Sequence, residues 1–254
     1  MLTTSLHIKT AAKPMGKGSF DMANIAINGM GRIGKLVLRA LVSEGVDADI
    51  VLLHDSFGTP EQHALLLEFD TVHGRWDADI SCDDESISID GERMWMTSEP
   101  LIKNLPLDDL GVDLVIDCTG VFKSPAKLRP YYDAGVSKVL VSAPVKKAPA
   151  LNLVYGVNHD LYDHEKHDLI TAASCTTNCL APVVKVMHEE IGIMHGSITT
   201  IHNITNTQTI VDRPAKDMRR ARSAMNSLIP TSTGSATAIT MIYPELEGRL
   251  NGHA

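Results

Sequence analysis

A glycine motif near the start of the chain constrains its fold most strongly. Gly29-x-Gly31-x-x-Gly34 follows the apolar run Asn24–Ile27 and opens the helical pattern Ile33–Val42. Glycines in such a turn allow the backbone to approach a pyrophosphate closely, and the N-terminus of the following helix attracts its negative charge. A strand, a glycine turn and a helix in this order predict a dinucleotide-binding domain of the Rossmann type.

The pattern after Asn24 alternates short apolar runs with helical periodicity. Alternation of this kind predicts an α/β fold, in which helices cover both faces of a mostly parallel, doubly wound sheet. Asp90-Gly91 is typical of a tight turn and predicts a hairpin over Ser86–Trp95. The expected strands are Asn24–Ile27, Ile50–Leu53, Leu114–Ile116, Lys138–Val141 and Leu151–Val154, and the expected helices are Ile33–Val42, Glu61–Leu67 and Ala126–Ala134.

Composition narrows the class of protein. With 254 residues and 44% hydrophobic content the chain can bury a core, and no run of about 18 apolar residues predicts a membrane span. A net charge of −8 argues against a surface that binds nucleic acid. The four cysteines form neither a disulfide framework nor a metal-ligand spacing, so we expect no metal and a reducing, cytoplasmic location.

Cys175 stands where the apolar run Asp168–Ala173 gives way to a helix. The first N–H groups of a helix have no backbone partner, so they stabilise a thiolate and lower its pKa. Either Ser174 or Thr177 could cap this helix. Cys179, four residues on, shares a helix face with Cys175, but a disulfide between them would close almost no loop. Cys175 is therefore the candidate nucleophile.

Asp55 ends the strand that follows the glycine motif, 21 residues after Gly34. A carboxylate there suits the ribose hydroxyls of NAD and repels the extra phosphate of NADP. The alternative role for Asp55 is that of a strand-end cap. The sequence thus predicts NAD as the cofactor.

The second part of the chain has fewer strands than a stable sheet needs. A helix is expected over Cys175–Glu190, then one β-like run (Ser197–Thr205), an amphipathic helix (Lys216–Leu228) and a helical stretch after Thr233. A lone strand cannot satisfy its own edges, so an incomplete α+β catalytic domain is expected. The predicted organisation is a disordered extension over residues 1–22, the dinucleotide domain over 23–174 and the truncated catalytic domain over 175–254.

Several segments, in order, resemble phosphorylating glyceraldehyde-3-phosphate dehydrogenases, from about Asn24 to the last residue. The resemblance implies that Cys175 is the nucleophile and His202 the base, and that the main chain of Arg32 and Ile33, together with Thr119, Gly120 and Ser142, surrounds NAD. It also implies substrate or phosphate contacts by Ser174, Thr176, Thr205, Arg219, Thr233 and Gly234. The segments that carry it are Ile27–Gly34, Phe69–Gly74, Val141–Pro144, Ser174–Cys179, Thr199–His202 and Ile229–Gly234.

The resemblance implies oxidation of glyceraldehyde 3-phosphate through a cysteine thioester, with inorganic phosphate as acceptor, in a homotetramer when the protein is intact. Leu67–Phe69, Leu128–Asp133 and Thr205–Asp212 look more like the branch associated with arsenate resistance, in which arsenate replaces phosphate. Two alternatives remain at this point. One is a semialdehyde dehydrogenase, which Thr233-Gly234 argues against, and the other is a catalytically incompetent nucleotide-binding fragment.

Overall fold

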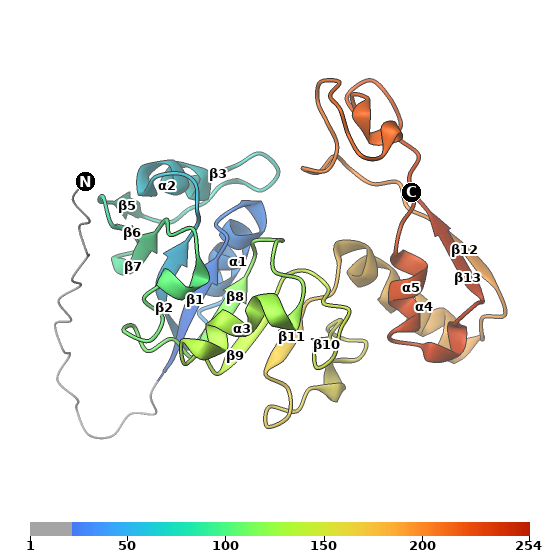
Figure 1. Ribbon diagram of the computed structural model, residues 1–254, viewed down its shortest axis with the longest axis horizontal. Helices are drawn as coiled ribbons and strands as arrows, with labels where there is room; N and C mark the ends of the chain where they lie inside the picture. Colours follow the sequence, from blue (N-terminus) through green and yellow to red (C-terminus); the bar gives the residue numbers. More distant parts are fainter. Residues whose placement is uncertain (1–21) are drawn as a thin grey trace.

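A computed structural model describes residues 22–254, which form a larger and a smaller lobe (Figure 1). The predicted extension over residues 1–22 lies outside the described residues, apart from Met22. The larger lobe is built on one nine-stranded sheet. In spatial order its strands are β10 (Leu151–Asn152), β11 (Leu169–Thr171), β9 (Lys138–Val141), β8 (Leu114–Asp117), β1 (Ala23–Asn28), β2 (Ala48–His54), β7 (Glu92–Thr97), β6 (Ser86–Ile89) and β5 (Ile80–Cys82).

All neighbouring strands from β10 to β7 pair in parallel, so their carboxyl ends share one edge of the sheet. The β5–β6–β7 end is antiparallel. The hairpin between β6 and β7 turns at Asp90 (φ 51°) and Gly91 (φ 88°), the left-handed pair that Asp-Gly favours. The expected strands and this hairpin are confirmed, except that the strand expected over Leu151–Val154 ends at Asn152. The strand β11 adds a parallel neighbour to β9.

Helices α1 (Arg32–Ser43), α2 (Pro60–Glu68) and α3 (Pro125–Asp133) confirm the predicted positions within a few residues. Successive residues of the central strand β1 face opposite sides of the sheet. Ile25 and Ile27 pack with Leu38 of α1, whereas Ala26 packs with Leu128 of α3. The sheet therefore has a core on each face, and the predicted doubly wound α/β fold is confirmed.

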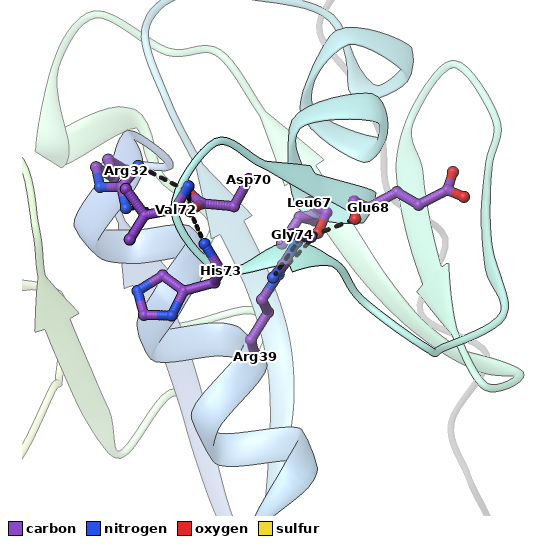
Figure 2. Close-up of polar contacts among 8 residues, drawn as sticks. All are labelled: Arg32, Arg39, Leu67, Glu68, Asp70, Val72, His73 and Gly74. Carbon is purple, nitrogen blue, oxygen red and sulfur yellow. Dashed lines mark hydrogen bonds and ion pairs between the residues drawn. The ribbon is translucent and has the colours of Figure 1, made fainter.

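Two arginines of α1, the buried Arg39 and the exposed Arg32, hold the short hairpin that follows α2 (Figure 2). Arg39 donates to the carbonyls of Leu67 (2.8 Å from Nε) and Glu68 (3.1 Å from Nη2), where α2 ends and leaves carbonyls without helical partners. Arg32 forms a two-pronged pair with Asp70, at 2.8 and 3.1 Å. The hairpin strands are β3 (Phe69–Asp70) and β4 (Gly74–Arg75).

The smaller lobe contains α4 (Cys175–Glu190), α5 (Ser235–Thr240) and a parallel pair, β12 (Gly196–Thr199) with β13 (Leu250–His253). The expectation of a lone strand over Ser197–Thr205 is wrong in two respects. The strand has a partner, and it ends at Thr199, opposite His253. Beyond that point Ala254 bonds Thr231 instead, so the ladder stops.

The predicted helix over Lys216–Leu228 is also wrong, because only a 3-10 turn forms there. Amphipathic periodicity yields a stable helix chiefly when its apolar face packs against something. Met218, Met225 and Leu228 are 80%, 64% and 92% exposed, so this face has no such support. The 3-10 turns of the structure are η1 (Ile102–Asn104), η2 (His159–Leu161), η3 (Met218–Ala221) and η4 (Pro244–Leu246).

A buried polar cluster joins α3 to the ends of β1 and β8. The Tyr131 hydroxyl donates to Asp117 at 2.8 Å and accepts from the Asn28 amide. Asp117 also accepts from the backbone and hydroxyl of Thr119, at 3.0 and 2.7 Å. Burial raises the pKa of Asp117, so its carboxylate depends on these donors.

We expect Tyr131→Phe to lower the free energy of unfolding by about 1–3 kcal/mol, because Asn28 and Asp117 each lose a buried partner. Urea unfolding followed by circular dichroism measures the change. Tyr132→Phe is the matched control, since its hydroxyl donates to the Asp168 carbonyl at a position that water can reach. Equal loss in the two variants would contradict the special cost of the buried cluster.

Candidate functional site

The glycine motif shapes the turn between β1 and α1. Gly29 has φ +95°, and a Cβ atom there would lie 2.5 Å from the backbone nitrogen of Thr119. A Cβ on Gly34 would lie 2.0 Å from the Gly29 carbonyl oxygen. Gly31 meets nothing within 4 Å, so its side is open. Two glycines therefore permit close backbone packing, and the third leaves room for a ligand.

A cavity of about 480 Å³ adjoins this turn at the carboxyl edge of the sheet. Six of the predicted cofactor-binding residues line it, namely Gly29, Gly31, Arg32, Ile33, Asp55 and Thr119. The first turn of α1 has no side-chain cap, which leaves its N–H groups available to an anion. The open glycine turn and the uncapped helix suit the pyrophosphate of NAD, and the carboxylate at the end of β2 suits its ribose.

Three other predicted residues lie next to segments that line the cavity. Gly34 packs against Gly29, and Gly120 (φ +67°) follows Thr119 in the turn after β8. Ser142 lies just after β9, where its N–H donates to the Asp117 carbonyl at 2.9 Å. None of these three is among the residues that line the cavity.

Sequence reasoning missed part of the cavity wall. Glu99 and Pro100 line it because β7 pairs in parallel with β2, which brings the segment after β7 to the same edge. Only the strand order shows that neighbour relation. Asn206, from the long segment after β12, lines it as well, and no sequence signal indicates this. Phe57 belongs to the segment directly after Asp55 and could have been included on that ground.

The thiol lies at the start of α4, directly after β11. Ala173 is buried with φ 54°, and this left-handed residue turns the chain sharply from the strand into the helix. The Ser174 hydroxyl accepts from the Thr177 N–H at 3.1 Å, so Ser174 and not Thr177 is the cap. The Asn178 amide donates to the carbonyls of Ala172 (2.7 Å) and Ser174 (2.9 Å). Cys175 is thereby presented on the first helical turn.

Cys175 and His202 meet, with Sγ and Nε2 3.7 Å apart. The other ring nitrogen of His202 lies 2.7 Å from the Asn203 carbonyl, which can only accept, so Nδ1 carries a proton. Nε2 therefore faces the sulfur as either acceptor or donor. The hydrogen bond with His202, followed by those from Thr176, lowers the pKa of Cys175. The Asn203 carbonyl, followed by Cys175, raises the pKa of His202, which favours a thiolate–imidazolium pair.

The other cysteines differ from Cys175 in their surroundings. Burial raises the pKa of Cys118 to about 11. Cys82 and Cys179 are exposed, and all four cysteines are free thiols. Among residues 22–254, no cluster of His, Cys, Asp or Glu side chains could hold a metal ion, and no helix is long and apolar enough to cross a membrane.

The predicted substrate-binding residues are spread over three places. Ser174 and Thr176 flank Cys175, while Thr233 and Gly234 precede α5, which packs against α4. Thr205 lies in the long segment after β12, where its hydroxyl lies 2.7 Å from the Gln208 side-chain oxygen. Arg219 forms a two-pronged pair with Asp217 at 3.0 and 2.9 Å, in the orange loop that projects away from α4 (Figure 1). Four of the six residues thus lie at the starts of α4 and α5, whereas Arg219 is paired with Asp217.

Comparison with known proteins gives a consistent result along the chain. The model of the glyceraldehyde 3-phosphate dehydrogenase NAD binding domain matches residues 23–125, and that of the C-terminal domain of the same family matches residues 174–254. Glyceraldehyde-3-phosphate dehydrogenase 3 of Nostoc sp. is 55% identical over 230 residues, which cover 91% of this chain and 68% of that protein. The glyceraldehyde-3-phosphate dehydrogenases of Streptomyces coelicolor and Geobacillus stearothermophilus are each 44% identical over the same shares.

The Rossmann-type domain, the cavity beside the glycine turn and the Cys175 thiol beside His202 agree with these matches. NAD is accordingly the cofactor, and the protein is an NAD-dependent oxidoreductase. The chain belongs to the glyceraldehyde-3-phosphate dehydrogenase family.

Proposed function

We propose that the protein oxidises glyceraldehyde 3-phosphate with NAD through a thioester on Cys175, and that an inorganic anion then releases the acyl group. The contact of 3.7 Å between Cys175 Sγ and His202 Nε2 carries this proposal. A thiol with a lowered pKa beside an imidazole with a raised one is the pair that aldehyde oxidation through a covalent intermediate requires. The names of the relatives support the choice of substrate.

The two side chains take successive roles. The Cys175 thiolate attacks the aldehyde carbon, and the imidazolium of His202 donates toward the oxygen that gains charge. The hydroxyl of the resulting thiohemiacetal then loses its proton to neutral His202 Nε2, while the carbon becomes a thioester carbon. NAD, when bound, accepts the hydride. Attack by an oxygen of the inorganic anion expels the Cys175 thiolate and frees the acyl product.

Two anions must be held near Cys175, the substrate phosphate and the attacking anion. We assign this role to Ser174, Thr176, Thr205, Arg219, Thr233 and Gly234. Hydroxyl and backbone donors orient an anion, and arginine adds charge with a forked geometry. The position of Thr233 and Gly234 before α5, which contacts α4, supports their assignment. Arg219 would have to exchange Asp217 for the anion, which the exposure of both side chains permits.

We propose Gly29, Gly31, Arg32, Ile33, Gly34, Asp55, Thr119, Gly120 and Ser142 as the NAD site, with Asp55 on the ribose hydroxyls. The cavity beside the glycine turn supports this placement. We divide the described chain into a cofactor domain up to residue 174 and a catalytic domain from residue 175. The family models, which match 23–125 and 174–254, agree with that division.

The acceptor anion, the cellular location and the oligomeric state are also part of the proposal. We propose phosphate as the acceptor and arsenate as a competing one, because the two anions have nearly the same shape and charge. The four free thiols support a reducing cytoplasm. Exposed apolar residues after β12, such as Ile201 (93%) and Val211 (76%), support association of subunits, and we propose a homotetramer.

Cys175 should react with limiting iodoacetamide at neutral pH before the other three cysteines do. The labelling rate should rise with pH around a midpoint below 9.0, the ordinary thiol value, because the pKa of Cys175 is lowered. His202→Ala should shift that midpoint upward and slow labelling at pH 7 by about tenfold, since each pKa unit changes the thiolate fraction tenfold. Mass spectrometry of peptides identifies the labelled residue.

Cys118, whose pKa is about 11, serves as the internal slow reference in the same digest. If Cys179 reacts as fast as Cys175, or if His202→Ala leaves the rate unchanged, the proposed thiolate activation is wrong.

Asp55→Ala should weaken NAD binding by roughly ten- to a hundredfold, because a carboxylate that binds hydroxyl groups contributes about 1.5–3 kcal/mol. The same change should narrow the preference for NAD over NADP, since it removes a negative charge that faces the extra phosphate. Calorimetric titration with each dinucleotide measures both effects. Asp49→Ala, at a solvent-exposed position in the same strand, is the matched control. Equal affinity of the unmodified protein for both dinucleotides would refute the role of Asp55.

The acceptor is tested by NADH formation from glyceraldehyde 3-phosphate in the presence of phosphate, of arsenate or of neither. We expect turnover with either anion, a single burst without one, and no burst in Cys175→Ser. Activity with a carboxylated semialdehyde instead of the phosphorylated aldehyde would point to a semialdehyde dehydrogenase. A folded protein that binds NAD but shows no burst with either aldehyde would point to a nucleotide-binding protein without activity.

A further inference from the structure

A buried lysine and a buried histidine lie beneath the proposed cofactor cavity, where the proposed reaction does not use them. Lys35 of α1 and His63 of α2 are 7% and 6% exposed. Lys35 Nζ contacts the carbonyl of Met30, in the glycine turn, and lies 2.9 Å from His63 Nδ1. His63 Nε2 lies 2.8 Å from the carbonyl of Phe57. Burying two such groups is costly unless they form hydrogen bonds, and here Lys35 Nζ and both ring nitrogens of His63 each have a partner.

The partners determine where the protons lie. The Phe57 carbonyl can only accept, so His63 Nε2 carries a proton. A charged Lys35 can only donate, so Nδ1 accepts from it and the imidazole is neutral. The pair therefore carries one positive charge. A second proton would place an N–H against the ammonium group and break the hydrogen bond between Lys35 and His63.

The hydrogen bonds connect two of the segments that line the cavity. Gly29 and Gly31, on either side of Met30, line it, and so do Asp55 and Phe57. The Phe57 N–H donates to the Asp55 carboxylate at 3.1 Å, so the segment bound by His63 also holds the carboxylate proposed for the ribose. A Cβ on Gly58 would lie 2.7 Å from His63 Nε2, which shows how closely this segment packs on the ring.

We propose that Lys35 and His63 are positioning residues for NAD, which hold the glycine turn and the Asp55 segment at a fixed separation through one chain of hydrogen bonds. This inference rests on the proposed placement of NAD in the cavity. It adds that affinity depends on two side chains that do not line the cavity. It also predicts that the chain of bonds opens when His63 takes up a proton.

The sign of the pH effect follows from the groups that face the pair. Burial lowers the pKa of His63 below its ordinary value of 6.5, the Lys35 charge lowers it further, and the Phe57 carbonyl and the Asp55 carboxylate oppose this. Burial lowers the pKa of Lys35, and Asp55 opposes that shift. The neutral ring therefore persists to a pH below 6.5. The bonds to both segments are intact above that range and are lost as the pH falls through the lowered pKa of His63.

NAD affinity, measured by calorimetry, tests the proposal without recourse to turnover. Lys35→Met and His63→Leu should each weaken binding by about tenfold, the loss expected for one buried hydrogen bond. Lys35→Arg, which keeps the donors, and His63→Gln, whose amide can both accept and donate, should stay within about threefold of the unmodified protein. Lys185→Met is the control, because Lys185, like Lys35, has two hydrogen-bond partners, in its case two carbonyls at 3.3 and 3.4 Å, but lies on α4.

The dependence of NAD affinity on pH distinguishes a positioning role from a merely structural one, which would not change it. As the pH falls from about 7.5 through the lowered pKa of His63, the unmodified protein should lose affinity, whereas His63→Gln, which has no imidazole to titrate, should not. Long-range proton–nitrogen NMR should find His63 protonated at Nε2, and Lys35→Met should raise its pKa. The same acid loss in His63→Gln would overturn the proposal, and this comparison decides the matter if Lys35→Met fails to fold.

Asp55→Ala distinguishes a failure of the positioning role of Lys35 and His63 from a failure of the placement of NAD in the cavity. If it weakens NAD binding while Lys35→Met and His63→Leu bind as the unmodified protein does, the positioning role is wrong and the placement of NAD stands. If Asp55→Ala leaves NAD binding unchanged, the placement of NAD in this cavity is wrong, and the positioning role is overturned with it.

Discussion

Three strands of the sheet end in close backbone contact at its carboxyl edge, and the cavity and the turns around it are built on that contact. The Gly29 N–H donates to the His54 carbonyl at 2.7 Å, and the Cys118 N–H donates to the Asn28 carbonyl at 2.6 Å. These bonds join the ends of β1, β2 and β8 directly beside the cavity. A side chain at Gly29 would collide with the backbone after β8, so the three segments can approach only because that residue is glycine.

The same edge also carries the thiol. β11 runs parallel to β9 and, through β8, to β1, so the chain leaves β11 toward Cys175 on the side where it leaves β1 toward the glycine turn. Thr171, at the end of β11, accepts from the Ala173 N–H at 3.1 Å and bonds the Asn152 side chain at 2.7 Å. This buried anchor holds the left-handed Ala173 in place. The proposed cofactor cavity and the proposed nucleophile therefore both lie at the carboxyl edge of one parallel sheet, where ligand sites in such folds generally lie.

Prediction from sequence succeeded where a feature depends on interactions between residues close in the sequence. Asp90-Gly91 forms the hairpin because both residues accept positive φ, and Ser174 caps α4 because its hydroxyl reaches the Thr177 N–H. It failed after β12. The periodicity of Lys216–Leu228 is that of an amphipathic helix, but the apolar residues Met218 and Leu228 remain exposed and the segment forms only the turn η3. A pattern shows which face could be buried, but a helix also needs a surface to pack against.

Local sequence suffices to predict the alternation of strands and helices, the glycine turn, the carboxylate after β2 and a cysteine at a helix start, because each depends on neighbours within a few residues. The remaining features arise only in the folded chain. The contact of Cys175 with His202, 27 residues away, the pairing of β12 with β13, and the hydrogen bonds that join Lys35 to His63 all link separate elements. Such contacts follow from the order and packing of the elements, and residue spacing carries no information about that order.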